Sequence, residues 1–464
     1  MLISELTEKF LDFEERYDKY NLKYKECEIW IYVRAHIFWL LCSRLKVFEI
    51  VTNSVGFPAY KQSVLEKIKE KTIYNPKYAS KRDVLIVSNP RKIYEDNTYR
   101  CIYFDLLDTA IKRSHYVWDR KYDTEEFLPQ KINNLLRVDI ALEKAQCELE
   151  RIPVAWLNKN IIYDIEKYFS IKLKVAEKQK ILEVATMVIS QRKRMSEFYS
   201  RILVKISPKV IVLNCYYNEN MMLLCECAKK LNIPTIELQH GVIGKYHIPY
   251  HFRSNGQFRC LPDYIFTFGQ YDKSKMRFPI PNNRIISVGF PALEDYYNRY
   301  SNKTSSHKSI NLLFVSSNDG VLEQYVSYIV DNLEENYSIS YKIHPAEKTV
   351  VFENKRIKVI DNKEINIYEC LSWADIVIGT YTTVLMEVVM FDKKVLVINS
   401  HTAGFVEVLY ESKSAILVDS KEELLEKIIN IEQYDFNKDN LLWEKDSLNK
   451  MIHAIEHVIS ENLK

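Results

Sequence analysis

The stretch PKVIVLNCYYNENMMLLCECAKKLNIPTIELQ, residues 208–239, decides the fold class. Its two ends, 208–214 and 233–239, are rich in Val, Ile and Leu, as expected of strands that are buried on both faces. Between them, residues 219–232 read as a helix because their apolar side chains recur at helical spacing. A strand, a helix and a second strand in this order predict a right-handed βαβ unit and a parallel sheet.

The same alternation continues along most of the chain. Towards the N-terminus, RDVLIVSNPRK (82–92) contains another buried strand, whereas the first 75 residues and residues 120–205 carry helical patterns. Towards the C-terminus, further strands are predicted at 263–269, 284–291, 311–317, 338–344, 356–361, 375–380, 394–399 and 414–419. The polar segment 297–309 separates the two series and is typical of a linker.

Two Rossmann-like α/β domains that face a cleft are therefore expected. The predicted organisation is a helical N-terminal region over 1–75, a first Rossmann-like domain with a helical insertion over 76–296, a second Rossmann-like domain over 310–440 and a C-terminal helix over 441–464. Ligands of such sheets bind beyond the carboxyl ends of the strands, near the switch point and the cleft between domains.

Composition narrows the class of protein. The 464 residues include 65 Lys and Arg against 62 Asp and Glu, and this net charge of +3 argues against a dedicated nucleic-acid binder. Nine cysteines without a C-x-x-C motif indicate reduced thiols in a cytoplasmic protein. The apolar stretch 29–42 contains Arg34 and His36 and is too short to span a bilayer, so we expect a core helix. A helix in the membrane interface, at the inner face of the cytoplasmic membrane, is the alternative.

A histidine lies at the end of the strand over 233–239. Gln239 closes this strand, and His240 and Gly241 follow it. An imidazole takes up a proton near neutral pH, so His240 is a candidate base for a hydroxyl that attacks an electrophile. Gly241 would let the backbone turn sharply or approach a ligand closely. The alternative is a histidine hydrogen-bonded in an ordinary loop. For His247, a contact with the molecule that carries the hydroxyl and a position in a surface loop are both open.

Polar side chains also follow the predicted strands of the second domain. Hydroxyl groups at a strand-to-helix turn can hold a phosphate together with helix amides, and a carboxylate one turn into the helix can accept hydrogen bonds from ribose. The candidates for nucleotide binding are Ser316, Ser317, Lys342, His344, Pro345, Thr380, Thr382, Thr383 and Glu387. Ordinary helix caps and solvated helix residues are the alternative.

Several other site types are not supported by the sequence. It contains neither G-x-G-x-x-G nor G-x-x-x-x-G-K-[S/T], so dinucleotide oxidoreductases and P-loop enzymes are disfavoured. His240, His247 and His251 lie close together in sequence, but Pro249 disfavours a helix there and no Cys, Asp or Glu completes a ligand set. We therefore expect no metal site and no cofactor.

Taken together, these motifs resemble those of GT-B glycosyltransferases, above all the bacterial enzymes of capsule and surface-polysaccharide assembly. The resemblance covers roughly residues 208–430 and rests on Gln-His-Gly at 239–241, His-Pro at 344–345 and Gly-Thr-Tyr-Thr-Thr at 379–383. Similar groups are the sialyl- and polysialyltransferases, the Kdo transferases of capsule export and, more distantly, the polyol-phosphate transferases of teichoic acid synthesis.

The match to the sialyltransferase group has one departure. In that group an acidic-acidic-Gly motif supplies the base, whereas this chain has Gln-His-Gly at 239–241 in its place. Asn-Asp-Gly at 318–320 fits the letters better but lies in the second domain. The teichoic acid enzymes carry a W-H-G-type motif with a histidine base, and this resemblance is a precedent for His240.

The resemblance implies an inverting, metal-independent glycosyltransferase that joins a nucleotide-activated sugar to a hydroxyl of a glycan or glycolipid acceptor. His240 would be the general base, and His344 would stabilise the departing phosphate of a donor held by the second domain. A CMP-activated ulosonic acid, sialic-acid-like or Kdo-like, is the favoured donor because of the His-Pro motif. Acceptor contacts would come from Gln239, Gly241, His247 and Arg91.

Three alternatives remain open at this point. The first keeps the fold but uses a UDP-sugar, a GDP-sugar or a CDP-polyol as donor. The second is a sugar-nucleotide 2-epimerase of the same two-domain plan, which needs several carboxylates around the anomeric carbon. The third is a partner subunit that keeps the fold without catalysis.

Overall fold

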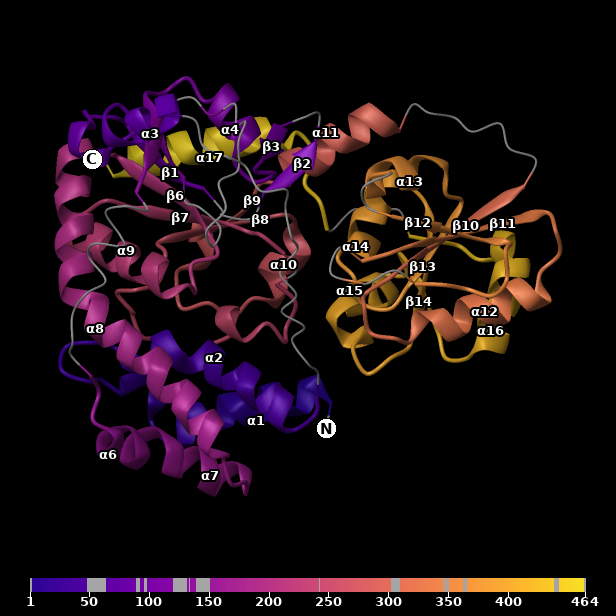
Figure 1. The fold of residues 1–464 in the computed structure, drawn as a ribbon, viewed down its shortest axis with the longest axis horizontal. Helices are drawn as coiled ribbons and strands as arrows, with labels where there is room; N and C mark the ends of the chain where they lie inside the picture. The colour runs from indigo at the N-terminus through magenta and orange to yellow at the C-terminus, as the bar shows by residue number, and fades with distance from the viewer. Residues whose placement is uncertain are drawn as a thin grey trace.

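Two parallel sheets lie side by side in the computed structural model, each with helices against its faces (Figure 1). The structure describes residues 2–47, 64–88, 92–95, 98–119, 132, 134–138, 151–241, 243–301, 309–344, 347, 350–361, 365–437 and 442–462. The predicted α/β architecture with two sheets is confirmed.

The first sheet has the strand order β5-β4-β1-β6-β7-β8-β9, and its neighbouring strands are parallel. These strands are β1 (Val84–Val87), β4 (His115–Asp119), β5 (Leu135–Arg137), β6 (Val210–Asn214), β7 (Thr235–Leu238), β8 (Tyr264–Thr267) and β9 (Ile285–Ser287). A small antiparallel hairpin of β2 (Ile93–Glu95) and β3 (Thr98–Arg100) follows β1. The chain builds outwards from β1 on one side and then returns to add β6 on the other, so the switch point lies between β1 and β6.

The second sheet repeats this order as β12-β11-β10-β13-β14-β15. Its strands are β10 (Ile310–Val315), β11 (Tyr337–Lys342), β12 (Ile357–Ile360), β13 (Ile376–Gly379), β14 (Lys394–Ile398) and β15 (Ile416–Val418). The switch point lies between β10 and β13, where Val315 is paired with Gly379.

Helices cover both sheets. Those of the first part of the chain are α1 (Ile3–Arg16), α2 (Ile29–Arg44), α3 (Val64–Lys71), α4 (Asp105–Ala110), α6 (Val154–Leu157), α7 (Tyr163–Phe169), α8 (Val175–Ile206), α9 (Glu219–Lys230), α10 (Gln270–Lys275) and α11 (Pro291–Tyr300). Those of the second part are α12 (Leu322–Asn332), α13 (Ile367–Trp373), α14 (Val384–Val388), α15 (Glu407–Glu411), α16 (Lys421–Ile429) and α17 (Ser447–Glu461). In the described part of the chain, no helix is long and apolar enough to cross a membrane.

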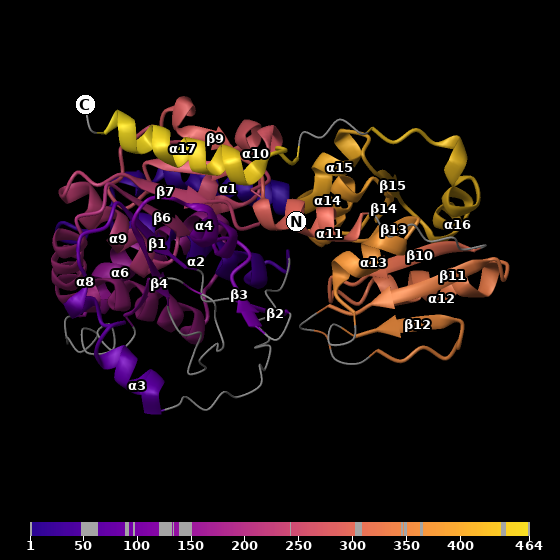
Figure 2. The same ribbon diagram turned by 90° about the horizontal axis from the view of Figure 1, so that it is seen from above.

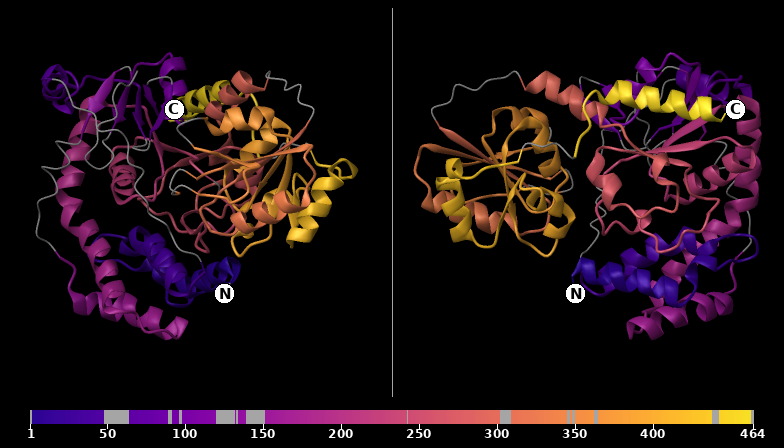
Figure 3. Two further views of the ribbon diagram at one scale, coloured as in Figure 1. Left: turned by 45° about the vertical axis from the view of Figure 1, so that its right-hand side comes forward. Right: turned by 180° about the vertical axis from the view of Figure 1, so that it is seen from behind.

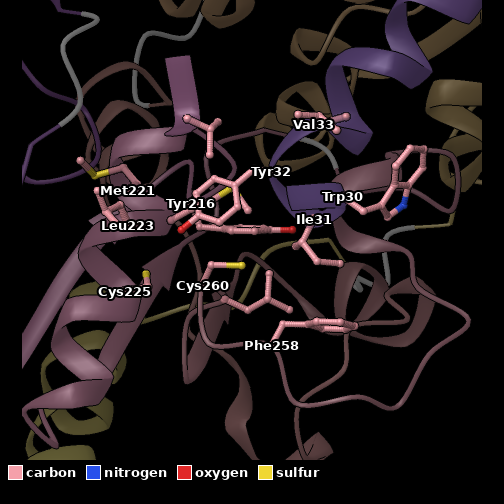
Figure 4. Packing of buried hydrophobic residues seen from close by; sticks show 14 of the residues in the cluster. Trp30, Ile31, Tyr32, Val33, Tyr216, Met221, Leu223, Cys225, Phe258 and Cys260 are labelled. Atoms are coloured by element: carbon pink, nitrogen blue, oxygen red, sulfur yellow. The ribbon is translucent and has the colours of Figure 1, made fainter. Parts of the chain in front are cut away.

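The N-terminal helices pack against one face of the first sheet. α2 is buried along most of its length, and Trp30, Ile31 and Tyr32 lie in one cluster with side chains of α9 and of the segment around Phe258 (Figure 4). The predicted core helix over 29–42 is therefore confirmed. Its Arg34 is also buried, and the Glu14 carboxylate of α1 pairs with it at 2.7 Å.

The C-terminal helix α17 returns to the first sheet. The chain leaves the second sheet after α16, and α17 then lies over the first domain (Figures 2 and 3). Its Ile455 and Val458 belong to the same buried cluster as Val84 of β1 and Val210 of β6. This face of the sheet is hydrophobic because alternate strand residues point towards α4 and α17, while the residues between them point towards α2, α8 and α9. The predicted domain limits at 75, 296, 310 and 440 stay a proposal.

Two element predictions are wrong in part. Residues 135–137, expected to be helical, form β5, because pairing with β4 outweighs the helical pattern around them. The linker expected over 297–309 starts too early, because α11 continues to Tyr300. This helix is packed against the second domain, since the rings of Tyr296 and Tyr368 stack with their centroids 3.9 Å apart. Residues 120–131, 139–150 and 302–308 lie outside the described residues.

Truncating a side chain of α17 tests whether this helix is part of the first domain's core. Ile455 is fully buried, so Ile455→Ala is expected to lower the free energy of unfolding by about 2–5 kcal/mol through lost apolar burial and an unfilled cavity. Chemical denaturation followed by circular dichroism measures the change. Ile429→Ala on α16 is the matched control, because Ile429 is 56% exposed and should shift stability by only about 0.5 kcal/mol. Equal effects of the two substitutions would contradict the role of α17.

Candidate active site

A cavity of about 170 Å³ lies where the carboxyl ends of the two sheets meet. The first domain contributes Ile102, Tyr103, Gln239, His240, Gly241, Phe268, Asp272 and Phe290. The second contributes Thr383, Met386 and Glu387, and Leu442 and Trp443 line it from the segment that leads back to α17. The cavity therefore brings together five of the residues predicted from sequence: Gln239, His240, Gly241, Thr383 and Glu387.

Two tyrosines flank the imidazole of His240, which lies just beyond the end of β7. Nε2 lies 2.9 Å from the hydroxyl of Tyr217, and Nδ1 lies 3.5 Å from the hydroxyl of Tyr250. The backbone carbonyl of His240 accepts a hydrogen bond of 2.7 Å from Tyr103. The side chain is 17% exposed, so it is held in place yet open to the cavity.

A buried carboxylate lies behind this histidine. Glu237 of β7 has no exposed surface, and its Oε1 accepts hydrogen bonds from the Tyr250 hydroxyl at 2.6 Å and the Tyr216 backbone N–H at 3.1 Å. The same oxygen lies 3.9 Å from Nδ1 of His240. Burial raises the pKa of Glu237 to about 8, and the hydrogen bonds oppose that rise. A carboxyl with such a pKa can gain or lose a proton near neutral pH.

Gln239 fastens the turn that carries His240. Its amide donates to the carbonyl of Gly241 at 2.8 Å, and its oxygen accepts from the backbone N–H of Phe268 at 2.7 Å. Asp272, in the same wall, accepts from the backbone N–H of Ile243 at 3.1 Å, and burial raises its pKa to about 6. Gln239 is 1% exposed, so its contact with an acceptor stays a prediction, whereas its contacts with the turn are direct.

Gly241 was expected to allow either a sharp turn or a close approach to a ligand. Its φ lies outside the left-handed region, and no described atom lies within 4 Å of where a Cβ would be. Because Gly241 also lines the cavity, a side chain here would extend into open space. Backbone strain therefore does not explain this glycine, and a ligand contact at Gly241 stays a prediction.

The loop after β7 reaches the second domain. Nζ of Lys245 lies 2.6 Å from Oε2 of Glu407, and the Tyr246 hydroxyl donates to the same carboxylate at 3.3 Å. His247 lies in this loop, with its ring 5.0 Å from the ring of Tyr250 and 6.5 Å from that of His240. It packs beside the cluster around His240 and does not line the cavity, so acceptor contact by His247 stays a prediction.

The hydroxyl groups at the switch point of the second sheet make hydrogen bonds within the protein. Thr380 donates to Asp319 at 2.6 Å, and Ser316 accepts from the N–H of Asn318 at 3.0 Å. The hydroxyls of Ser317 and Thr382 each accept a longer backbone hydrogen bond of 3.4 Å. None of these four residues, which were predicted to bind the nucleotide, lines the cavity. The contacts of Thr380 and Ser317 join the segments that follow β10 and β13, whereas those of Ser316 and Thr382 are local.

Lys342 and His344 lie at and beyond the end of β11, also away from the cavity lining. Lys342 is 2% exposed, and its ammonium group lies close enough to the Cys370 thiol to act on the pKa of that group. The backbone N–H of His344 donates to Glu347 at 2.9 Å, and burial lowers the pKa of its imidazole. Two further predicted site residues lie outside the described residues: Pro345, predicted to bind the nucleotide, and Arg91, predicted to contact the acceptor.

Glu387 faces the first domain across the cavity. It lies in the first turn of α14 beside Tyr368, and burial raises its pKa to about 7. Thr383 precedes this helix, is exposed and makes no capping hydrogen bond with its side chain. α14 has only five residues, so its backbone dipole adds less to anion binding than the sequence pattern suggested.

Sequence reasoning missed three residues that matter to this site. Tyr217 follows β6 at the switch point, and the strand-end rule used for His240 would have found it. Asp272 and Trp443 gave no such signal, because α10 and the segment before α17 reach the cavity only through the tertiary fold. Within the described ranges, no group of three or more His, Cys, Asp or Glu residues is placed to hold a metal ion.

Comparisons with known proteins identify the fold. No protein-family model matches the chain, and no curated protein matches it either. A protein described as a UDP-N-acetylglucosamine 2-epimerase of Listeria monocytogenes is similar in structure, with a TM-score of 0.50 and 13% sequence identity over 82% of this chain and 98% of that one.

Two further solved structures are somewhat less similar. The UDP-GlcNAc 2-epimerase of Neisseria meningitidis has a TM-score of 0.49 and 11% identity over 82% of this chain and 99% of that one. The wall teichoic acid polymerase TagF has a TM-score of 0.44 and 12% identity over 93% of this chain and 98% of that one. The similarity to the Listeria protein shows the fold alone, which is the predicted GT-B arrangement of two Rossmann-like domains around a cleft.

Proposed function

We propose that the chain is an inverting glycosyltransferase that moves a sugar from a nucleotide donor to a hydroxyl of a surface glycan. One observation carries the proposal: His240 of the first domain and Thr383 and Glu387 of the second line the same cavity. An acceptor and a donor that approach from opposite walls would meet there. A glycolipid acceptor would bring the chain to the inner face of the cytoplasmic membrane.

The chemistry needs a base on one side and a leaving group on the other. In the proposed reaction, His240 removes the proton of the acceptor hydroxyl as its oxygen attacks the anomeric carbon. The bond from that carbon to the donor phosphate breaks on the opposite face, so the configuration inverts. Residues of the second domain, His344 among them, would stabilise the phosphate without a metal ion. Glu387 lines the cavity and would accept hydrogen bonds from the ribose hydroxyls.

The favoured donor is a CMP-activated ulosonic acid, and a binding screen tests this choice. CMP, CDP, UDP and GDP are added separately, and the melting temperature is measured by differential scanning fluorimetry. A nucleotide at a hundred times its Kd stabilises the folded chain by about 2.7 kcal/mol. At equal concentrations the nucleotide with the lowest Kd raises the melting temperature most, and this is expected to be CMP. A larger shift with UDP, GDP or CDP would reject the CMP donor, and no shift with any of them would reject the proposed function.

A 2-epimerase is the second candidate, because the cavity holds more acidic groups than the sequence suggested. Asp272 and Glu387 both line it, and burial raises the pKa of each, to about 6 and about 7. An epimerase changes the sugar nucleotide by itself, whereas a transferase needs an acceptor. Incubating the chain with UDP-GlcNAc alone and following the sugar by NMR separates them: epimerised sugar without an acceptor would favour the second candidate.

A further inference from the structure

Four side chains form a continuous chain of hydrogen-bonding contacts at the switch point of the first sheet. Tyr217 contacts Nε2 of His240 at 2.9 Å, Nδ1 contacts Tyr250 at 3.5 Å, and Tyr250 contacts Glu237 at 2.6 Å. The residues come from the segment after β6, from β7 and its end, and from the 3-10 turn Ile248–Tyr250. The contact of 3.5 Å is long, as catalytic hydrogen bonds often are before substrate binds.

With an ionised Glu237 and a neutral His240, only one arrangement of protons satisfies these contacts. The carboxylate can only accept, so Tyr250 donates its single proton to Glu237. The oxygen of Tyr250 must then accept from Nδ1–H of His240. This leaves Nε2 without a proton, and it accepts from the hydroxyl of Tyr217. The neutral imidazole therefore presents a bare Nε2, which is the form that a general base needs.

We propose that Glu237 is the final proton acceptor of a relay that runs from His240 through Tyr250. This inference rests on the proposed function. The acceptor hydroxyl replaces Tyr217 at Nε2 and gives its proton to that nitrogen. Nδ1 passes its own proton to Tyr250, and Tyr250 passes its proton to Glu237. The acceptor oxygen bonds to the anomeric carbon, and the donor phosphate leaves with the electron pair of the broken bond.

The surroundings of Glu237 suit this task. It is fully buried, its Oε1 takes its hydrogen bonds from neutral donors, and His240 is the ionisable base beside it at 3.9 Å. An ionised carboxylate is costly in such a place, so the transfer of a proton to it is favourable. Tyr250 is also fully buried, so water does not compete for the proton along the path.

The position of the proton on His240 can be read without any substrate. In histidine-labelled protein at a pH above 8, where Glu237 is ionised, the ring-nitrogen NMR shifts should show a proton on Nδ1 and none on Nε2. Tyr250→Phe removes the partner of Nδ1–H, so the proton should move to Nε2 in a substantial fraction of molecules. Tyr264→Phe is the matched control: this buried tyrosine also donates to a glutamate, Glu461 at 3.0 Å, but on α17, and should leave the His240 signals unchanged.

Transfer kinetics with Glu237→Gln complete the test. A glutamine still accepts from Tyr250 but does not take up a proton, so kcat should fall about 10²-fold or more while KM and the His240 tautomer stay close to those of the unchanged chain. A kcat within about threefold of the original would overturn the relay, as would a proton on Nε2 of His240 in the unchanged chain. The expected tautomer in a chain that transfers no sugar would reject the proposed function and leave the hydrogen-bond arrangement in place.

Discussion

Sugar transfer is expected to fall by about 10²–10⁴-fold in His240→Ala, while nucleotide binding survives. The imidazole lines the wall of the cavity that belongs to the first domain, whereas the nucleotide would be held by the second. Removing it takes away the base and leaves the donor contacts intact. Rates of transfer are measured in single-turnover experiments with the donor found by the nucleotide screen, and binding is measured by calorimetry.

A second histidine provides the control for this experiment. His457 of α17 is 63% exposed, pairs with Glu461 and is not among the residues that line the cavity, so His457→Ala should transfer sugar at the original rate. Unchanged turnover in His240→Ala would remove this residue from the base's role. A parallel loss of nucleotide affinity would mean that His240 contacts the donor instead.

Arg34→Met is expected to lower the free energy of unfolding by about 3–5 kcal/mol. Arg34 and Glu14 are buried, and the guanidinium contacts both carboxylate oxygens, at 2.7 and 2.8 Å. It also donates to the carbonyls of Ile248 and His251 at 2.7 and 2.8 Å. The substitution therefore leaves a buried charge unpaired and releases two carbonyls next to Tyr250. Urea denaturation measures the change.

An exposed ion pair within α1 is the matched control. Arg16 lies 3.2 Å from Asp12 on α1, and their side chains are 66% and 39% exposed. Arg16→Met should change stability by about 0–1 kcal/mol, because water replaces the lost partner at little cost. If Arg34→Met cost no more than Arg16→Met, the buried pair would not be what fixes the N-terminal helices to the loop after β7.

The βαβ series was predictable because its strands are buried on both faces. Short continuous apolar runs such as Val84–Val87 and Val210–Asn214 are typical of strands buried on both faces of a parallel sheet. β5 was not predictable, since Leu135–Arg137 becomes a strand only by pairing with β4. That pairing depends on contacts between distant residues, which local periodicity does not contain.

The candidate site was predictable in part from polar residues that lie between a strand and the next element. His240, after β7, and Thr383, between β13 and α14, were found in this way, and both line the cavity. The rule says nothing of hydrogen bonds inside a turn, so Ser316 and Thr380 could not be distinguished from Thr383 by sequence. It also cannot find Trp443, which reaches the cavity from a segment far along the chain.

The return of α17 to the first sheet makes the second domain an insertion with two attachments. The chain passes from the first domain to the second after α11 and comes back before α17. On the return, the indole of Trp443 donates to the carbonyl of Met386 at 2.9 Å, and the N–H of Glu444 donates to the carbonyl of Phe268 at 2.8 Å. The second sheet is therefore joined to the first at both of its ends along the chain, and these two hydrogen bonds attach the return segment to each of the two domains.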